Sequence, residues 1–218
     1  LKHLLIVFHS KTGNTATLAD AVVRGATSDD VGDVEVRMLR AAEAGPEDVM
    51  WADALLLGTP ENFGYLSGAL KDFLDRTFYE VEGKLSPLPY AMFVSAGNDG
   101  SGAVRAMERI ANGYPFIAVQ QPVIAKGEPS ATDLQTCESL GLAMALGIEM
   151  GMYFFHNDSS GCWRLKLFIV FLFCYIFDLR RASRHSIAIA QKRFLLPIHQ
   201  PRATVFVPVV IISQHDFV

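Results

Sequence analysis

A short polar loop follows the first apolar run of the chain, and its residue types suit the binding of a phosphate group. The apolar run at residues 4–8 predicts a buried strand, and the pattern that starts at Thr15 predicts a helix. The loop between them reads Ser10, Lys11, Thr12, Gly13, Asn14 and Thr15. Backbone N–H groups converge at a helix N-terminus, and hydroxyl groups add hydrogen bonds to an anion held there. The alternative is an ordinary strand-to-helix turn capped by a serine or threonine.

The loop lacks the two common nucleotide-binding signatures. It contains neither G-x-x-x-x-G-K-[ST] nor G-x-G-x-x-G, which argues against a nucleoside triphosphate and against a dinucleotide pyrophosphate. A single glycine among several hydroxyl groups suits one phosphate monoester. Within this loop, the Lys11 side chain either adds positive charge to the site or points to solvent.

The first 152 residues alternate between strand and helix patterns. Short apolar runs predict strands at residues 3–8, 34–38, 54–58, 90–94 and 116–119. Apolar residues at spacings of three and four predict helices at residues 15–27, 66–79, 101–112 and 133–150. Five strands alternating with helices predict an α/β fold, with a five-stranded parallel sheet between two layers of helices.

In a parallel sheet of this kind, ligands bind outside the carboxyl ends of the strands, where the strand order reverses. Three loops should therefore meet: residues 10–15, residues 59–65 after the third strand, and residues 95–102 after the fourth. All three contain glycine and amide residues. Glycine lets the backbone approach a flat ligand closely, although the third loop also fits a plain glycine-rich turn.

Two of these loops resemble those of a known group of flavoproteins. Residues 10–15 resemble the FMN-phosphate loop of flavodoxins. The NAD(P)H-dependent oxidoreductases of the flavodoxin superfamily have a flavin-ring loop and following helix similar to Gly58-Thr59-Pro60-Glu61-Asn62-Phe63-Gly64 and residues 67–76. The resemblance extends over about residues 2–153. It implies a flavodoxin-like three-layer sandwich with strand order 2-1-3-4-5, for which flavodoxin itself is a standard example.

The resemblance also implies a role for each matching position. The FMN phosphate loop would consist of Ser10, Lys11, Thr12, Gly13, Asn14 and Thr15. The isoalloxazine ring would be bordered by Thr59, Pro60, Glu61, Asn62, Phe63 and Gly64, and its pyrimidine side by Ser95, Gly97, Asn98 and Asp99. Two alternatives stay open: Glu61 as a solvated loop acid, and Phe63 with Tyr65 as anchors of the next helix. No side chain is predicted to be catalytic, because the flavin carries the electrons.

The implied function is an enzyme that takes a hydride from NAD(P)H onto FMN and passes electrons to a quinone, a flavin or a similar small acceptor. The alternative is a flavodoxin-type carrier that shuttles single electrons between proteins. Carriers commonly hold the flavin between aromatic rings, often Trp and Tyr. The second loop offers Phe63 and Tyr65 but no Trp, which favours the enzyme. Related oxidoreductases often form homo-oligomers, so self-association is a further expectation.

The charge of the chain changes sharply near residue 153. Residues 1–152 contain 11 Lys and Arg against 20 Asp and Glu, a net charge of −9, whereas residues 153–218 contain 8 against 3, a net charge of +5. This asymmetry predicts a flavodoxin-like domain at residues 1–152 and a basic, aromatic-rich tail at residues 153–218. No nucleic-acid partner is expected of the acidic domain. Three cysteines without metal-ligand spacing fit a reducing cytoplasm and predict no metal site.

The tail has no steady amphipathic period. Its longest apolar run, residues 167–177, has 11 residues, whereas a membrane span needs roughly 20. The favoured interpretation is a segment that is not an evolved domain. The alternatives are an anchor to a membrane surface, because arginines follow the apolar run, and an extension that binds a partner.

Overall fold

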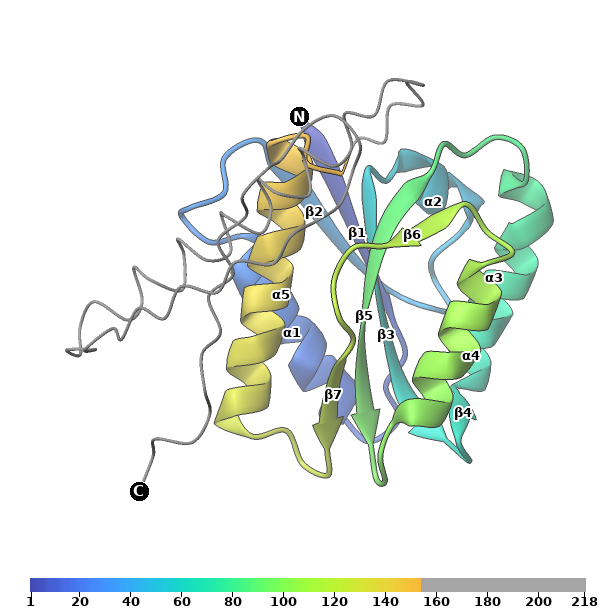
Figure 1. Cartoon of the computed structure of the whole chain (residues 1–218), viewed down its shortest axis with the longest axis vertical. Coiled ribbons are helices and arrows are strands. Elements are labelled where there is room, and N and C mark those ends of the chain that lie inside the picture. Colours follow the sequence, from blue (N-terminus) through green and yellow to red (C-terminus); the bar gives the residue numbers. More distant parts are fainter. Residues whose placement is uncertain (154–218) are drawn as a thin grey trace, which may run out of the picture. The chain divides into compact units, whose positions relative to one another are not determined.

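The computed structural model describes residues 1–153, so the predictions for the tail beyond Tyr153 lie outside the described residues. The described residues form one sheet whose main strands lie in the order β2-β1-β3-β5-β6 (Figure 1). These strands are β1 Lys2–Phe8, β2 Val34–Arg40, β3 Ala54–Asn62, β5 Leu88–Ala96 and β6 Phe116–Ala118. All four pairings between them are parallel. The predicted parallel sheet and its strand order are confirmed.

Two further strands were not predicted. The short strand β4, Tyr65–Leu66, pairs antiparallel with the end of β3 and forms a hairpin with it. Strand β7, Val123–Lys126, pairs with the second half of β5, whereas β6 pairs with its beginning. The predicted fifth strand, residues 116–119, corresponds to β6 alone, so the prediction of this edge of the sheet was incomplete. Pro122 lies between the two pieces, and proline has no N–H group for a continuous ladder.

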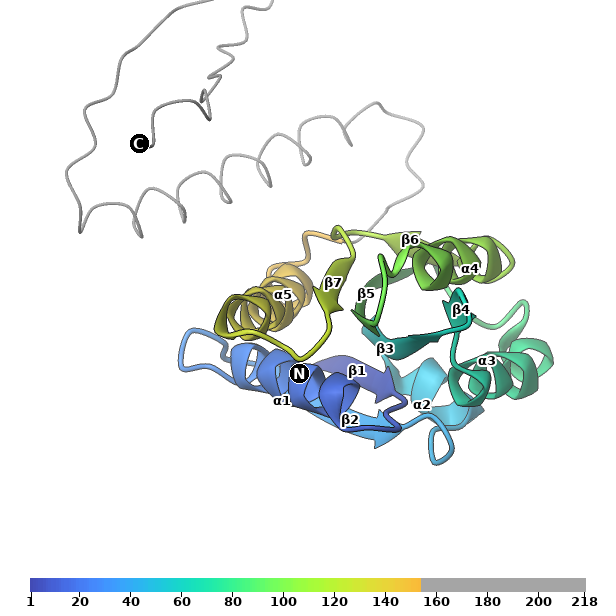
Figure 2. The same cartoon turned by 90° about the horizontal axis from the view of Figure 1, so that it is seen from below.

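Helices cover both faces of the sheet (Figures 1 and 2). They are α1 Asn14–Ala26, α2 Pro46–Trp51, α3 Gly68–Val81, α4 Ser101–Ala111 and α5 Ala131–Glu149. Helices α1 and α5 lie on one face, and α3 and α4 lie on the other. The four longer helices were predicted from their apolar spacing, whereas α2 has only six residues and carries too little periodicity to be recognised.

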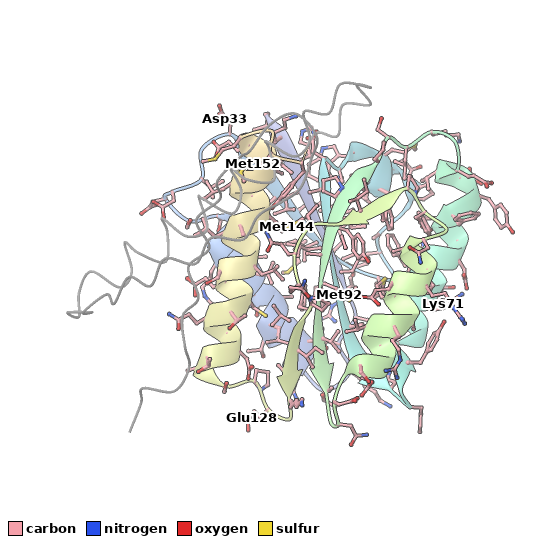
Figure 3. The ribbon with its side chains drawn as sticks, in the orientation of Figure 1. Asp33, Lys71, Met92, Glu128, Met144 and Met152 are labelled. Atoms are coloured by element: carbon pink, nitrogen blue, oxygen red, sulfur yellow. The ribbon has the colours of Figure 1, made fainter. Side chains whose placement is uncertain are left out.

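Successive strand residues enter two separate cores, because side chains alternate across a strand. Leu4 and Ile6 of β1 pack in the core beneath α1 and α5, whereas Leu5 and Val7 pack in the core on the other face. Figure 3 shows Met144 on α5 and Met92 on the sheet, and they belong to these two cores respectively. Because both of their faces are buried, the inner strands β1 and β5 are mainly apolar, whereas the edge strand β2 also carries Glu35, Arg37 and Arg40.

Helices α1 and α5 pack with their backbones in contact. A Cβ atom added at Gly141 of α5 would lie 1.9 Å from the Val22 carbonyl oxygen, and one added at Gly25 of α1 would lie 1.8 Å from the Glu138 carbonyl oxygen. Neither backbone can move aside without separating the helices from the sheet. The two glycines therefore set the distance between these helices.

We expect Gly141→Ala to destabilise the protein by about 1–3 kcal/mol, because overpacking outweighs the better helix propensity of alanine. Gly68→Ala is the matched control, since it makes the same change in α3 where no heavy atom lies within 4 Å of the added Cβ. Urea unfolding followed by circular dichroism measures both. Equal stability of the two variants would contradict the close packing of α1 on α5.

A second expectation concerns a shortened chain that ends at Tyr153. Tyr153 is buried, and its hydroxyl donates to the Ala143 carbonyl oxygen at 3.2 Å, so the core of the described residues extends to Tyr153. Within residues 1–153, no helix is long and apolar enough to cross a membrane. The shortened chain should unfold cooperatively and be more soluble than the full chain, which carries the apolar run at residues 167–177. Thermal unfolding and sedimentation check this, and aggregation of the shortened chain alone would place the boundary elsewhere.

Candidate functional site

The candidate site lies at the carboxyl ends of the strands, where the strand order reverses. Strand β1 has β2 on one side and β3 on the other, so the chain turns opposite ways after β1 and after β3. The arrowheads of β5 and β7 mark this end at the bottom of Figure 1, and Figure 2 looks onto it. The three predicted loops meet there. A fourth loop, residues 127–130, follows β7 and includes Glu128, which lies at this end in Figure 3.

The first loop ends in an open helix N-terminus. Gly13 is the N-cap of α1 with φ 104, a conformation that suits only glycine, and no side chain caps the helix. The first turn of α1 contains no acidic residue. The Ser10 hydroxyl accepts from the Gly13 N–H group at 3.2 Å and closes the loop. The first N–H groups of the helix proper are therefore left for an external acceptor.

The longer helices α3, α4 and α5 have such acceptors within the chain. Ser67 and Ser130 cap α3 and α5, and carboxylates serve α4. A Cβ atom added at Gly13 would meet no heavy atom within 4 Å, so the space above α1 is open. Lys11 and Thr12 are exposed beside that space. The residues present thus fit the phosphate group of FMN, which the first loop was predicted to hold.

His9 precedes this loop and does not contribute positive charge to it. Burial lowers the pKa of the imidazole, and the nearby charges of Arg40 and Lys11 lower it further. The side chain is therefore neutral at pH 7. Its buried Nδ1 atom has no hydrogen-bond partner among the described residues. Lys11 is thus the cationic side chain of the loop itself.

The second loop is a tight hairpin formed by β3 and β4. Glu61 pairs with Leu66 and Asn62 pairs with Tyr65, which leaves Phe63 and Gly64 as the two turn residues. Both have positive φ, 52 and 70, as a two-residue hairpin of type I′ requires. The Phe63 side chain is fully exposed. It does not anchor α3, and its backbone conformation is unusual for a bulky residue.

The acids Glu61 and Asp99 both bind the N-terminus of α4. The Glu61 carboxylate accepts from the N–H groups of Gly100 at 3.2 Å and Gly102 at 3.0 Å. Glu61 is thus not a solvated loop acid. Asp99 accepts from the Ser101 N–H group at 3.1 Å and from its hydroxyl at 2.8 Å. The side-chain bond to Ser101, followed by the backbone bond, lowers the pKa of Asp99.

Hydrogen bonds made by side chains, to other side chains or to the backbone, join the loops to one another. The hydroxyls of Thr15 and Ser95 are buried and lie 2.7 Å apart, which joins the first loop to the third. The Asn14 amide donates to the Gly127 carbonyl oxygen at 3.0 Å, which joins the first loop to the fourth. The buried Thr59 hydroxyl accepts from the Ser67 N–H group at 2.9 Å. Several predicted site residues thus hold the loops in place.

The remaining predicted residues lie at the surface of the same region. Pro60 and Asn62 are partly buried, and Gly97 and Asn98 are exposed at the end of β5. The structure therefore brings all three predicted loops together. The fourth loop was missed. Its signal is the sequence Gly127-Glu128-Pro129-Ser130, which directly follows a short apolar run and precedes a helix.

The described residues support neither a metal site nor a nucleophilic thiol. No group of three or more His, Cys, Asp or Glu side chains within residues 1–153 could hold a metal ion. Cys137 is fully buried, and burial raises the pKa of its thiol to about 12. A thiol with this pKa does not act as a nucleophile near neutral pH.

Solved structures similar to this chain define its class of fold. A flavodoxin from the domain Archaea superimposes with a TM-score of 0.58 and 22% identity, covering 67% of this chain and 99% of its own. A flavodoxin, WrbA-like protein from Agrobacterium tumefaciens superimposes with a TM-score of 0.57 and 21% identity, covering 69% and 99%. The fold is therefore flavodoxin-like, as the sequence predicted.

The sequence matches a family within this class. A profile of the NADPH-dependent FMN reductase family matches residues 4–129, more than half of the chain, and the chain belongs to that family. A flavodoxin of Aquifex aeolicus is 31% identical over 158 residues, covering 65% of this chain and 84% of its own. An NAD(P)H dehydrogenase (quinone) of Acidithiobacillus ferrooxidans is 27% identical, covering 64% and 78%. Family membership confirms the predicted class, an NAD(P)H-dependent flavin oxidoreductase with FMN as its flavin.

Thr12 and Thr15 were both predicted to bind the phosphate, but the structure gives them different surroundings: Thr12 is exposed and Thr15 is buried. We expect Thr12→Ala to weaken FMN binding about 10- to 100-fold, since a hydrogen bond to a charged group contributes about 1.5–3 kcal/mol, and to leave the free protein stable. Thr15→Ala should also destabilise the free protein by about 1–3 kcal/mol, because the buried Ser95 hydroxyl loses its partner.

Thr27→Ala, at the other end of α1, is the control for both variants. Flavin fluorescence titration gives the affinities, and urea unfolding gives the stabilities. An unchanged FMN affinity for Thr12→Ala would show that its hydroxyl does not contact the phosphate.

Proposed function

We propose that this protein transfers electrons from NAD(P)H, through bound FMN, to a quinone, a flavin or a similar small acceptor. The observation that carries the proposal is the N-terminus of α1, which has no internal acceptor and opens at the point where the strand order reverses. Hydrogen bonds within the chain join the loops around this point to one another. Loops held in this way support the proposal, because less ordering is needed when FMN binds.

Each part of the site has a separate task in this proposal. The N–H groups at the start of α1, with Ser10, Thr12 and Lys11, would bind the phosphate. Residues 60–64 and 97–99 would border the isoalloxazine ring. When bound, FMN supplies the hydride acceptance and electron release, and the protein supplies binding and orientation. The side chains therefore need no acid or base at the centre of the site.

The exposed aromatic rings of the hairpin support a planar acceptor. Phe63 is fully exposed and Tyr65 is 44% exposed, so neither ring is buried in the core. Flat aromatic rings stack on other planar molecules. The relatives named NAD(P)H dehydrogenase (quinone), one of them from Syntrophus aciditrophicus at 25% identity, favour a quinone among such acceptors.

A single-electron carrier is the second candidate, and the identity to the Aquifex aeolicus flavodoxin favours it. The structure supplies a contrary observation. Trp51 stacks on His3, with ring centroids 4.4 Å apart, and Arg37 lies 3.9 Å from its ring centroid. His3 is near the amino end of β1, so this tryptophan lies away from the proposed flavin loops. The aromatic sandwich common among carriers is thus not formed by Trp51.

We expect NADPH or NADH, added under nitrogen, to reduce the FMN-loaded protein and bleach its yellow colour. A quinone added afterwards should oxidise the flavin and restore the colour. The absorbance of the flavin measures both steps. Free FMN at the same concentration is the control, because it reacts with nicotinamides slowly without the protein. If both nicotinamides leave the colour unchanged, while a chemical reductant removes it in two separate one-electron steps, the carrier function holds instead.

A further inference from the structure

The Glu61 side chain connects two loops of the proposed site through the backbone of α4. We propose that Glu61 is a positioning residue: its carboxylate clamps the β3–β4 hairpin onto the N-terminus of α4 and thereby sets the ring side of the flavin site. This inference rests on the proposed function and deepens it, since it names the residue that fixes the second loop relative to the third.

The clamp consists of three hydrogen bonds that backbone N–H groups donate to one carboxylate. Oε2 accepts from the Gly100 N–H group at 3.2 Å, and Oε1 accepts from the N–H groups of Gly102 at 3.0 Å and Ala103 at 3.4 Å. These donors form the first turn of α4, where the helix dipole attracts negative charge. Bonds from N–H groups to a carboxylate are also stronger than those to a neutral oxygen.

The hairpin needs an external clamp because its turn is strained. Phe63 has φ 52, which disfavours a side chain of this size, and its exposed ring packs against nothing that would offset the strain. The opposing contact comes from α4. A Cβ atom added at Gly102 would lie 2.0 Å from the Gly64 carbonyl oxygen, so the turn rests directly on the helix backbone.

The phosphate side of the site does not depend on this clamp. Its loop is held by the bonds of Thr15 to Ser95 and of Asn14 to Gly127, neither of which involves Glu61. Loss of the Glu61 charge should therefore displace residues 62–64, which follow it directly, and leave the phosphate loop in place. The substitution should therefore weaken the binding of a flavin without a phosphate by the same factor as the binding of FMN.

The test replaces Glu61 by glutamine, which keeps the size but loses the charge and one acceptor. We expect E61Q to weaken FMN and riboflavin binding by the same factor, about 10-fold or more, with the ratio of the two affinities unchanged. D133N is the matched control. Asp133 accepts from the Ser130 N–H group at 2.9 Å at the start of α5 and does not touch the hairpin, so its loss should lower stability but leave both affinities within about twofold.

Hydrogen exchange of the free protein distinguishes two roles of Glu61, a clamp that holds the hairpin and a cap that stabilises only α4. In E61Q, exchange should become faster in residues 61–66 as well as in residues 100–103, whereas loss of a cap alone would affect only residues 100–103. Should E61Q fail to fold, E61D keeps the charge with a shorter reach and takes its place. Native exchange in residues 61–66 or native riboflavin affinity would overturn the inference. Absence of flavin binding by the unaltered protein would overturn the proposed function, and exchange would still decide whether Glu61 clamps the hairpin.

Discussion

Backbone N–H groups at a helix N-terminus need hydrogen-bond acceptors, and this need determines how the loops at the carboxyl ends of the strands are arranged. Helices α3 and α5 satisfy that need with the hydroxyls of Ser67 and Ser130, and α4 satisfies it with Glu61 and Asp99. Helices α1 and α4 both follow a glycine N-cap, but among these four helices only α1 lacks a side chain that accepts from the N–H groups of its first turn. The start of α1 is therefore the proposed anion site, because the N-termini of the other three helices already have acceptors. Of those acceptors, Glu61 also joins two loops, since it lies on the β3–β4 hairpin and binds the start of α4.

Close backbone contact is the second condition for this arrangement. Gly58 lies where a Cβ atom would be 2.3 Å from the Phe93 ring, and Gly102 lies under the hairpin turn. Gly141 allows α5 to approach α1, and α1 carries the phosphate loop at its first turn. A side chain at any of these positions would push apart elements whose relative placement the site requires. These glycines matter because they have no side chain, so neighbouring elements can pack closely against their backbone. The residue type alone does not indicate which glycines have this role.

Elements with a regular apolar period could be predicted from the sequence, whereas features that depend on distant neighbours could not. Four helices and the parallel sheet were predictable, because each long element has a regular apolar pattern, whereas the strand order was implied only by the resemblance to flavodoxins. Strand β7 was missed because it is a second short piece that continues the sheet edge beyond β6, and α2 because six residues show no period. The three site loops were predictable from position and from resemblance. The roles of Thr59, Glu61 and Asp99 were not, because a carboxylate or hydroxyl can face a ligand or a backbone N–H group with the same sequence around it.

Phe63 in the hairpin turn is both strained and exposed, which supports its proposed place at the flavin site. Asparagine or glycine at position 63 would suit the positive φ, and a polar residue would suit the exposure. Phenylalanine is unfavourable on both counts, so the fold alone gives no reason for it. Glu61 and Gly102 hold the turn against this strain, at the edge of the site where a planar acceptor would arrive. We therefore propose that the ring of Phe63 stacks on a planar molecule bound at this edge of the site.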